Sequence, residues 1–183
     1  MKKSKFLIVV LAGFSCSGKS IISKKLSDLY GFDLMEQHII YKNIAFSKGY
    51  KRARHWLRDV GKEIFIKETT LETIRQIKSL TKSKGVIIDA HYGPKMHSFL
   101  SSELPETKVI TILLTSNKNI RVKRMTRRIN KPVKEAIEEL NFRDDFLKTA
   151  GLKKIKGKAD FIVVNNDSLE TALAGISQII SNL

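Results

Sequence analysis

Apolar runs and segments of helical periodicity alternate along the chain. Short apolar runs predict strands, at residues 6–12, 32–35, 86–89, 109–115 and 161–164. Apolar positions three or four residues apart predict helices between them, at residues 19–29, 40–80 in two or three pieces, 96–102, 117–129, 133–148 and 168–180. The last helix has Ser168 as its N-cap, and its apolar positions share one face, at Leu169, Leu173, Ile176 and Ile180.

The order of these elements predicts the fold class. Strands that alternate with helices indicate an α/β fold, here a three-layer sandwich with a parallel sheet between two layers of helices. The apolar runs are continuous rather than alternating, which is typical of parallel strands buried on both faces. No repeat or Pro/Gly-rich linker divides the 183 residues, so we expect a single domain. Residues 150–158, rich in glycine and lysine, predict a flexible connection.

Composition indicates the cellular compartment of the protein. The chain has one cysteine, Cys16, so it cannot form an internal disulfide, and a reducing cytoplasm fits this usage. No run approaches the ~18 apolar residues that a membrane span needs. We therefore expect a cytoplasmic protein without a membrane partner, and the sequence leaves the oligomeric state open.

The charge is strongly positive and unevenly distributed. The formal net charge is +16, from 34 Lys and Arg against 18 Asp and Glu, which predicts an anionic partner or else a compositional bias. Eight cations and no acid lie between residues 118 and 134, and six cations and no acid between residues 42 and 58. This clustering favours anion binding over a uniformly solvated surface.

A phosphate-binding motif follows the first predicted strand. The letters GFSCSGKS at residues 13–20 fit Gly-x-x-x-x-Gly-Lys-[Ser/Thr], with a helix directly after them. Glycines let backbone N–H groups point at phosphate oxygens, and the helix adds its positive N-terminal end. ATP and Mg²⁺ are therefore the predicted cofactors, with Lys19 at the β- and γ-phosphates and the Ser20 hydroxyl on the metal. The predicted nucleotide-binding residues are Gly13, Ser15, Cys16, Ser17, Gly18, Lys19, Ser20 and Ile21. Two roles for Cys16 are compatible with the sequence: a small residue that fills space in the loop, or a catalytic thiol.

Polar residues follow the third apolar run. Asp89 ends that run, and the carboxyl ends of parallel strands face the ligand crevice. We expect Asp89 to support Mg²⁺ or the second substrate, unless it only caps the next turn. His91, two residues later, either contacts a phosphoryl acceptor or has a structural role.

The two basic segments suggest how phosphates would be held. Arg121, Arg124 and Arg128 share one face of a predicted helix, and guanidinium groups fit phosphoryl oxygens. Over bound phosphates they would neutralise the transferring group; alternatively they would contact a nucleic-acid backbone. Arg54 and Arg58, four residues apart in the other segment, predict a site for a second, phosphate-bearing substrate. Trp56 and Leu57 lie off that face, so we expect them to be buried.

The chain resembles P-loop kinases of the nucleoside and nucleotide monophosphate kinase family. The shared order is a strand with its phosphate loop, a helical insert, a strand ending in aspartate, another strand and an arginine-rich helix. The closing letters ADFIVVNNDSLETAL resemble the end of dephospho-CoA kinases and adenylate-kinase-like enzymes. The letters RDVGKEIF at residues 58–65 are similar to an acceptor-binding helix of deoxynucleoside monophosphate kinases.

The resemblance implies a five-stranded parallel sheet of the P-loop NTPase type, an acceptor-binding insert at about residues 36–82 and a lid at about residues 118–148. It implies further roles for particular residues: Asn165 and Asn166 at the adenine, Arg58 and Arg54 at the acceptor phosphate, Arg124 and Arg128 as catalytic lid residues, and Asp33 in acceptor deprotonation.

Together these features predict a Mg²⁺·ATP-dependent phosphotransferase. The expected acceptor is a small phosphate-bearing molecule, foremost a nucleoside or deoxynucleoside monophosphate. Two alternatives remain: a kinase of dephospho-CoA or another small metabolite, and a nucleotide-controlled ATPase that associates with RNA or the ribosome through the basic face.

Overall fold

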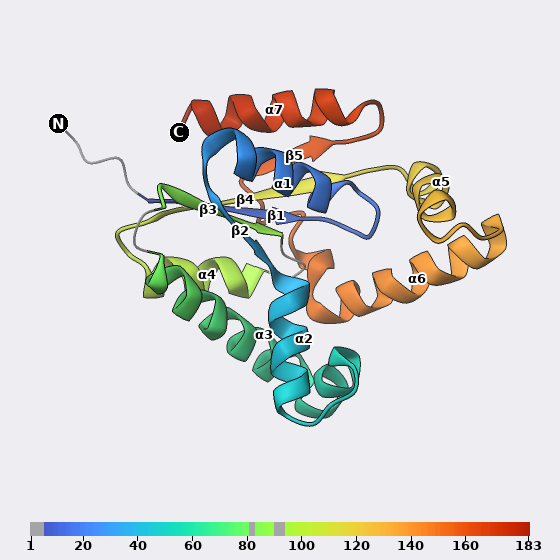
Figure 1. Cartoon of the computed structure of the whole chain (residues 1–183), viewed down its shortest axis with the longest axis horizontal. Coiled ribbons are helices and arrows are strands. Elements are labelled where there is room, and N and C mark those ends of the chain that lie inside the picture. The colour runs from blue at the N-terminus through green and yellow to red at the C-terminus, as the bar shows by residue number, and fades with distance from the viewer. Residues whose placement is uncertain (1–5, 81–82, 90–93) are drawn as a thin grey trace.

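The sheet is the centre of the molecule. The computed structural model describes residues 6–80, 83–89 and 94–183, without the Pro94 side chain, and within them one parallel sheet has the strand order β2-β3-β1-β4-β5 (Figure 1). The strands are β1 (Leu7–Ala12), β2 (Asp33–Glu36), β3 (Gly85–Asp89), β4 (Lys108–Thr115) and β5 (Phe161–Val164). The α/β fold and the five-stranded parallel sheet predicted from the sequence are confirmed.

The helices connect the strands. They are α1 (Lys19–Tyr30), α2 (Gln37–Ser47), α3 (Ala53–Ser79), α4 (Pro94–Glu103), α5 (Lys118–Ile129), α6 (Val133–Ala150) and α7 (Leu169–Ser181). The predicted segment 40–80 forms α2 and α3, and α3 is kinked at Gly61, which has φ of +77°. Ser168 caps α7 as predicted, because its hydroxyl accepts a hydrogen bond from the backbone N–H of Thr171.

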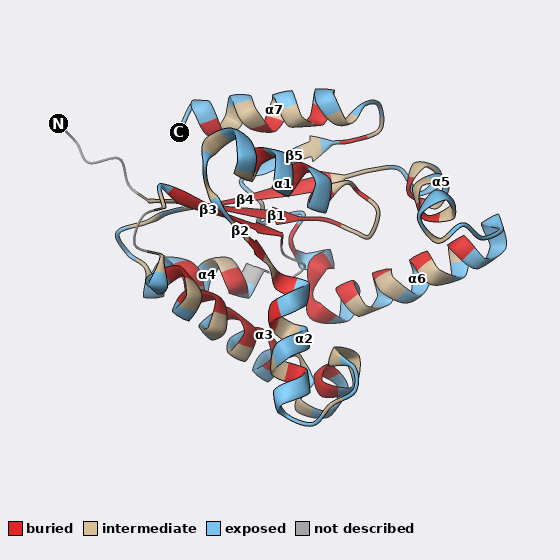
Figure 2. Ribbon diagram, in the orientation of Figure 1, coloured by how far each residue is buried: buried red, intermediate tan, exposed pale blue. Residues whose placement is uncertain are grey.

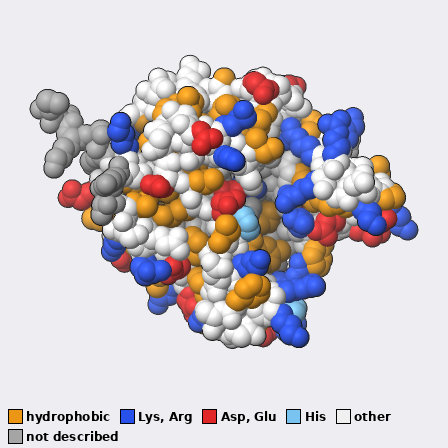
Figure 3. Space-filling model, in the orientation of Figure 1, with side chains coloured by type: hydrophobic (Ala, Val, Ile, Leu, Met, Phe, Trp, Pro, Cys, Tyr) orange, Lys and Arg blue, Asp and Glu red, His pale blue; other side chains and the backbone are white. Residues whose placement is uncertain are grey.

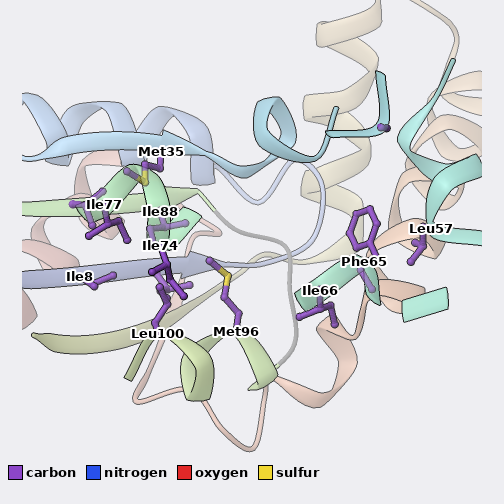
Figure 4. Packing of buried hydrophobic residues seen from close by; sticks show 14 of the residues in the cluster. Ile8, Met35, Leu57, Phe65, Ile66, Ile74, Ile77, Ile88, Met96 and Leu100 are labelled. Carbon is purple, nitrogen blue, oxygen red and sulfur yellow. The ribbon is translucent and has the colours of Figure 1, made fainter. Parts of the chain in front are cut away.

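Helices cover both faces of the sheet, and each face has its own apolar core (Figures 1 and 2). Val9 and Leu11 of β1 lie on the face covered by α1 and α7, whereas Ile8 and Val10 lie on the face covered by α3 and α4. Figure 4 shows part of the second core, where side chains of β1, β3, α3 and α4 meet. Both faces of β1 are therefore buried, which accounts for its continuous apolar run.

Two segments differ from the sequence-based expectation. The edge strand β5 is not buried, since Phe161, Ile162 and Val164 are all exposed. Its apolar run resembles that of the central strands, but an edge strand has a neighbour on one side only. Residues 150–158, predicted as a flexible connection, include the 3₁₀ turn η1 (Leu152–Lys154) and bury Leu152 and Ile155 against Leu147. Apolar packing therefore anchors this segment.

The strands are parallel, so their carboxyl ends meet at one side of the sheet. β1 leads there into the phosphate loop, and Asp89 and Glu36 pair in register at the ends of β3 and β2. Among the described residues, no helix has the length and apolar character needed to cross a membrane.

Candidate active site

The phosphate loop, residues 13–20, joins β1 to α1 and needs glycine at two positions. Gly13 and Gly18 have φ of +152° and +103°, in the region that residues with a side chain rarely adopt. A Cβ atom on Gly13 would lie 2.3 Å from the Leu114 carbonyl oxygen, and one on Gly18 would lie 2.3 Å from the Asn165 Nδ2 atom. Both glycines are therefore required by close packing as well as by backbone conformation.

Lys19 is enclosed by this loop. Its side chain is buried, and its Nζ atom donates to the carbonyl oxygens of Gly13 at 2.8 Å and Phe14 at 3.2 Å. Burial lowers the pKa of Lys19, and the negative charge of Asp89 opposes that change. The ammonium group is thus held at the inner side of the loop.

Ser20 and Asp89 form a pair that suits a divalent cation. The Ser20 hydroxyl donates to the Asp89 Oδ2 atom at 2.6 Å. The Asp89 carboxyl is buried, and its Oδ1 atom has no hydrogen-bond partner within the described residues. A buried carboxylate oxygen without a partner is unfavourable, and Mg²⁺ prefers oxygen ligands of this kind. The predicted metal residues therefore fit the ion.

The described residues contain no cluster of three or more His, Cys, Asp or Glu side chains able to bind a metal. This is compatible with Mg²⁺, which is usually held by one or two carboxylates together with substrate phosphates.

An ion pair between α5 and α6 holds the outer part of the loop. The Arg121 Nη1 atom lies 2.7 Å from the Asp144 Oδ2 atom, and the two side chains are 10% and 8% exposed. Arg121 also donates to the Ser15 carbonyl oxygen at 3.1 Å, and the Ser15 N–H donates to the Asp144 Oδ1 atom at 3.2 Å. The two helices thus bind both polar groups of the Ser15 backbone.

Arg124 and Asn165 bind the next turn of the loop. Arg124 Nη1 donates to the carbonyl oxygens of Cys16 at 3.3 Å and Ser17 at 3.4 Å. Its Nη2 atom donates to the Asn165 backbone oxygen at 3.1 Å and to the Asn165 Oδ1 atom at 3.2 Å. The Asn165 Nδ2 atom completes the network by donating to the Ser17 carbonyl oxygen at 2.8 Å. Arg124 therefore supports the loop from outside.

A large cavity lies beside the loop. Its volume is about 1070 Å³, and it is lined by the loop, α2, the start of α3, α5 and α6. Figure 3 shows Lys and Arg side chains on both sides of this hollow. The phosphate loop and α2 contribute Lys19 and Lys42, the connection before α3 contributes Lys51 and Arg52, and the start of α3 contributes Arg54. From α5 and α6 come Arg124, Arg127, Arg128 and Arg143. One acidic side chain, Glu139, lies among the described residues that line it, so the cavity is suited to anions.

Comparison of the sequence with known proteins identifies relatives of this chain. No family model matches the chain. It is 26% identical over 170 residues to the cytidylate kinase of Sulfurisphaera tokodaii, which covers 90% of this chain and 88% of that protein. It is also 26% identical over 139 residues to the cytidylate kinase of Desulfurococcus amylolyticus, covering 74% of this chain and 68% of that protein.

Solved structures share the architecture over nearly the whole chain. An uncharacterized protein of Eubacterium ventriosum has a TM-score of 0.66 at 19% identity, covering 97% of this chain and 99% of that one. A gluconokinase of Sinorhizobium meliloti has a TM-score of 0.59 at 18% identity, covering 99% and 97%. A shikimate kinase of Acinetobacter baumannii has a TM-score of 0.56 at 16% identity, covering 98% and 96%.

The chain has the fold of a P-loop kinase. Its predicted resemblance to P-loop nucleotide kinases is confirmed. The solved structures show the fold, and the two curated relatives support a phosphotransferase that acts on a small substrate.

Within this P-loop kinase fold, several predicted site residues meet at the cavity. The cavity is lined by most of the phosphate loop together with Arg54, Arg124, Arg128 and Asn165. Asp89 accepts a hydrogen bond from the loop residue Ser20. Asn166 instead accepts a hydrogen bond from the Asn117 N–H at 2.8 Å and does not line the cavity.

Other predicted residues lie elsewhere in the structure. Asp33 is exposed at the start of β2, at the opposite end of the strands from the phosphate loop. The Arg58 side chain is 74% exposed and pairs with Asp59 rather than lining the cavity. His91 lies outside the described residues. Trp56 and Leu57 are buried, as predicted.

Three site residues were missed by the sequence reasoning. Asp144 has no local signal, because its partners lie 23 and 129 residues away. Arg143, which lines the cavity and donates to the Glu139 Oε1 atom at 2.6 Å, lies in a helix of mixed charge. Glu36 ends β2 beside Asp89 and could have been found by extending the predicted strand by one residue.

Proposed function

We propose that this protein transfers the γ-phosphoryl group of ATP to the phosphate of a nucleoside monophosphate. The observation that carries the proposal is the cavity, which joins a phosphate loop to a wall of arginines from α3, α5 and α6. Two phosphorylated ligands meeting there would place donor and acceptor together. Cytidylate is the first acceptor to test, because both curated relatives are named cytidylate kinases.

The donor side uses the phosphate loop. Its backbone N–H groups and the start of α1 would bind the triphosphate, and Lys19 would contact the β- and γ-phosphates. Ser20 and Asp89 would hold Mg²⁺, which when bound neutralises charge on the phosphate oxygens. In the transfer, the bond from the γ-phosphorus to the bridging oxygen breaks and a bond to an acceptor phosphate oxygen forms. The products are ADP and a nucleoside diphosphate.

The acceptor side uses arginines. The Arg54 guanidinium lies 3.5 Å from the ring centroid of Phe142, so α3 and α6 meet at this point. Burial, followed by the positive charge of Arg52, lowers the pKa of Arg54, and Arg143 contributes in the same direction. Such crowding of cations favours a bound dianion. Arg54 and Arg143 would bind the acceptor phosphate, with residues 36–82 as the acceptor insert.

The lid would be residues 118–148, with Arg128 closing over the transferring group. Arg124 contacts loop carbonyl oxygens, so it would act by holding the loop that carries the phosphates. An acceptor phosphate is already an anionic nucleophile, so this reaction needs no general base.

The test is ADP release from Mg²⁺·ATP with a panel of acceptors. The panel contains CMP, UMP, AMP, GMP, their deoxy forms and dephospho-CoA, with Lys19→Ala as the blank. We expect a nucleoside monophosphate to raise turnover to ~1–100 s⁻¹, the usual range for kinases. Turnover that is slow and indifferent to every acceptor would contradict the proposal.

One observation favours a second candidate, a kinase of hydroxyl acceptors. Glu36 lies in register with Asp89 at the carboxyl end of the sheet and is only partly exposed. A hydroxyl acceptor must lose a proton, and a carboxylate in this position would accept it. Shikimate and gluconate therefore belong in the panel. Glu36→Gln should leave phosphate transfer to a nucleotide nearly unchanged but lower transfer to a hydroxyl by about 100-fold or more.

A further inference from the structure

The mouth of the cavity carries more positive charge than two small phosphorylated ligands require. Lys42, Lys51 and Arg127 line the cavity and are exposed, and none has an ion-pair partner among the residues that the structure describes. Within the described residues, cations without an ion-pair partner also occur away from the mouth, as at Lys153 and Lys154, so what distinguishes the three side chains is that they line one cavity. The proposed function does not use these three side chains.

Tertiary structure places these cations on two facing walls. Lys42 and Lys51 come from α2 and the loop before α3, and Arg127 comes from α5. These side chains belong to two acid-free basic segments of the sequence, residues 42–58 and 118–134, and the fold brings both segments to one cavity, which has Lys and Arg side chains on both sides (Figure 3). A polyanion crossing the mouth would contact both walls.

Exposed aromatic rings lie among these cations. Phe46 and Phe142 line the cavity, although 49% and 46% of each residue remain exposed. Each ring has a cation against it: Lys42 Nζ lies 5.4 Å from the Phe46 centroid, and the Arg54 guanidinium lies 3.5 Å from the Phe142 centroid. Exposed rings beside cations can stack with nucleobases while the cations contact phosphates.

We propose that the cavity mouth binds single-stranded nucleic acid. Phosphates would lie along Lys42, Lys51 and Arg127, and bases would stack on Phe46 and Phe142. Single strands fit better than duplexes, because stacking on a side chain needs an unpaired base. This binding is additional to the proposed phosphotransfer and does not rest on it.

The first experiment measures binding of a labelled single-stranded oligonucleotide by fluorescence anisotropy, with RNA and DNA arms and a series of salt concentrations. The triple variant K42Q/K51Q/R127Q should weaken binding about tenfold or more. It should also reduce the log–log salt slope by about 2, since a single strand contributes roughly 0.7 per phosphate contact. The matched control K153Q/K154Q/K156Q removes the same charge from exposed lysines that do not line the cavity. Equal losses in the two triple variants would overturn the proposal.

The second experiment isolates base stacking. Phe46→Ala should weaken oligonucleotide binding about tenfold and leave binding of inorganic polyphosphate, which has no bases, unchanged. Leu29→Ala is the control, because Leu29 is 62% exposed and does not line the cavity. If Phe46→Ala has no effect, or if polyphosphate and duplex bind as tightly as a single strand, the mouth is a general polyanion site and the proposal is wrong.

Failure of this inference can be told apart from failure of the proposed function. Lys19→Ala should abolish phosphotransfer but retain oligonucleotide binding, because Lys19 is buried inside the phosphate loop. Loss of oligonucleotide binding in this variant would place the strand in the phosphate loop and contradict a site at the mouth.

Discussion

At the scale of single residues, the phosphate loop depends on a few buried polar contacts. Arg121 and Asp144 bind the Ser15 backbone from outside, while Lys19 binds two carbonyl oxygens from inside. A loop that must present its N–H groups to phosphates cannot satisfy its own carbonyl oxygens through regular secondary structure. Arg121 and Lys19 supply the missing donors, and Asp144 accepts from the Ser15 N–H, so these side chains determine the conformation of the loop.

The Arg121–Asp144 pair gives a prediction that separates stability from activity. Asp144→Ala leaves a buried guanidinium without a counter-charge and should lower the free energy of unfolding by about 3 kcal/mol. The double variant R121M/D144L should recover most of that loss, because a buried ion pair can be replaced by apolar packing. ATP turnover should stay low in both, since both variants lose the Asp144 carboxylate that accepts the hydrogen bond from the Ser15 N–H. Urea unfolding and turnover measure the two effects, and a double variant as unstable as Asp144→Ala would contradict the argument.

Tyr41 gives a prediction on pH dependence. Burial, followed by the negative charge of Asp89, raises the pKa of Tyr41 to about 12 from its ordinary value of 10.0. The unfolded chain therefore loses this proton at lower pH than the folded protein, so stability is complete below pH ~10 and falls as the pH rises towards ~12. At pH 11 the loss should be about 1 kcal/mol. Urea unfolding of wild type and Tyr41→Phe between pH 8 and 11 tests this, and parallel pH profiles would contradict it.

At the scale of elements, the site is assembled from the ends of secondary structures. β1 ends at the phosphate loop and α1 begins at Lys19, while β3 and β2 end at Asp89 and Glu36. Parallel strands place all of these ends at one side of the sheet. The helices α5 and α6 then close the loop from outside, and α2 and α3 form the opposite wall of the cavity.

Substitution by alanine should be harmful at a glycine of the phosphate loop and stabilising at a glycine of a helix. Gly18→Ala would place a Cβ atom 2.3 Å from Asn165 Nδ2 at a φ of +103°, so it should displace Asn165 and weaken ATP binding about tenfold or more. Gly175→Ala, in α7 where the added Cβ has open space, should stabilise the protein by about 0.5–1 kcal/mol. Calorimetric ATP titration and thermal unfolding measure these effects. Unchanged ATP affinity in Gly18→Ala would show that the loop tolerates the side chain.

At the scale of the whole molecule, the cavity lies among elements from distant parts of the chain, so a ligand there should stabilise the native state. ATP at 100 times its dissociation constant should add about 2.7 kcal/mol. For a chain of 183 residues this corresponds to a rise of about 5–10 °C in the melting temperature.

Differential scanning fluorimetry with increasing Mg²⁺·ATP measures this shift. Lys19→Ala should reduce the shift strongly, whereas K153Q/K154Q/K156Q should preserve it. An equal shift in wild type and Lys19→Ala would place ATP binding outside the phosphate loop.

The sequence by itself determined the helices, the strands and the phosphate loop. Apolar periodicity is local, and so is the Gly-x-x-x-x-Gly-Lys-Ser spacing between a strand and a helix, so both could be read from neighbouring residues. The sheet, the helices and the pair of Ser20 with Asp89 all follow from that pattern together with the rule that parallel strands end at one side.

Tertiary structure alone decided which charged residues form the site. Arg54 lines the cavity and Arg58 does not, although both belong to the same basic segment. Asp144 binds a loop 129 residues away, and Glu36 rather than Asp33 lies beside Asp89. These outcomes depend on where helices pack and how strands register, because a side chain's role at a site follows from its distance to groups far away in the sequence. The spacing of neighbouring residues in the sequence does not determine that distance.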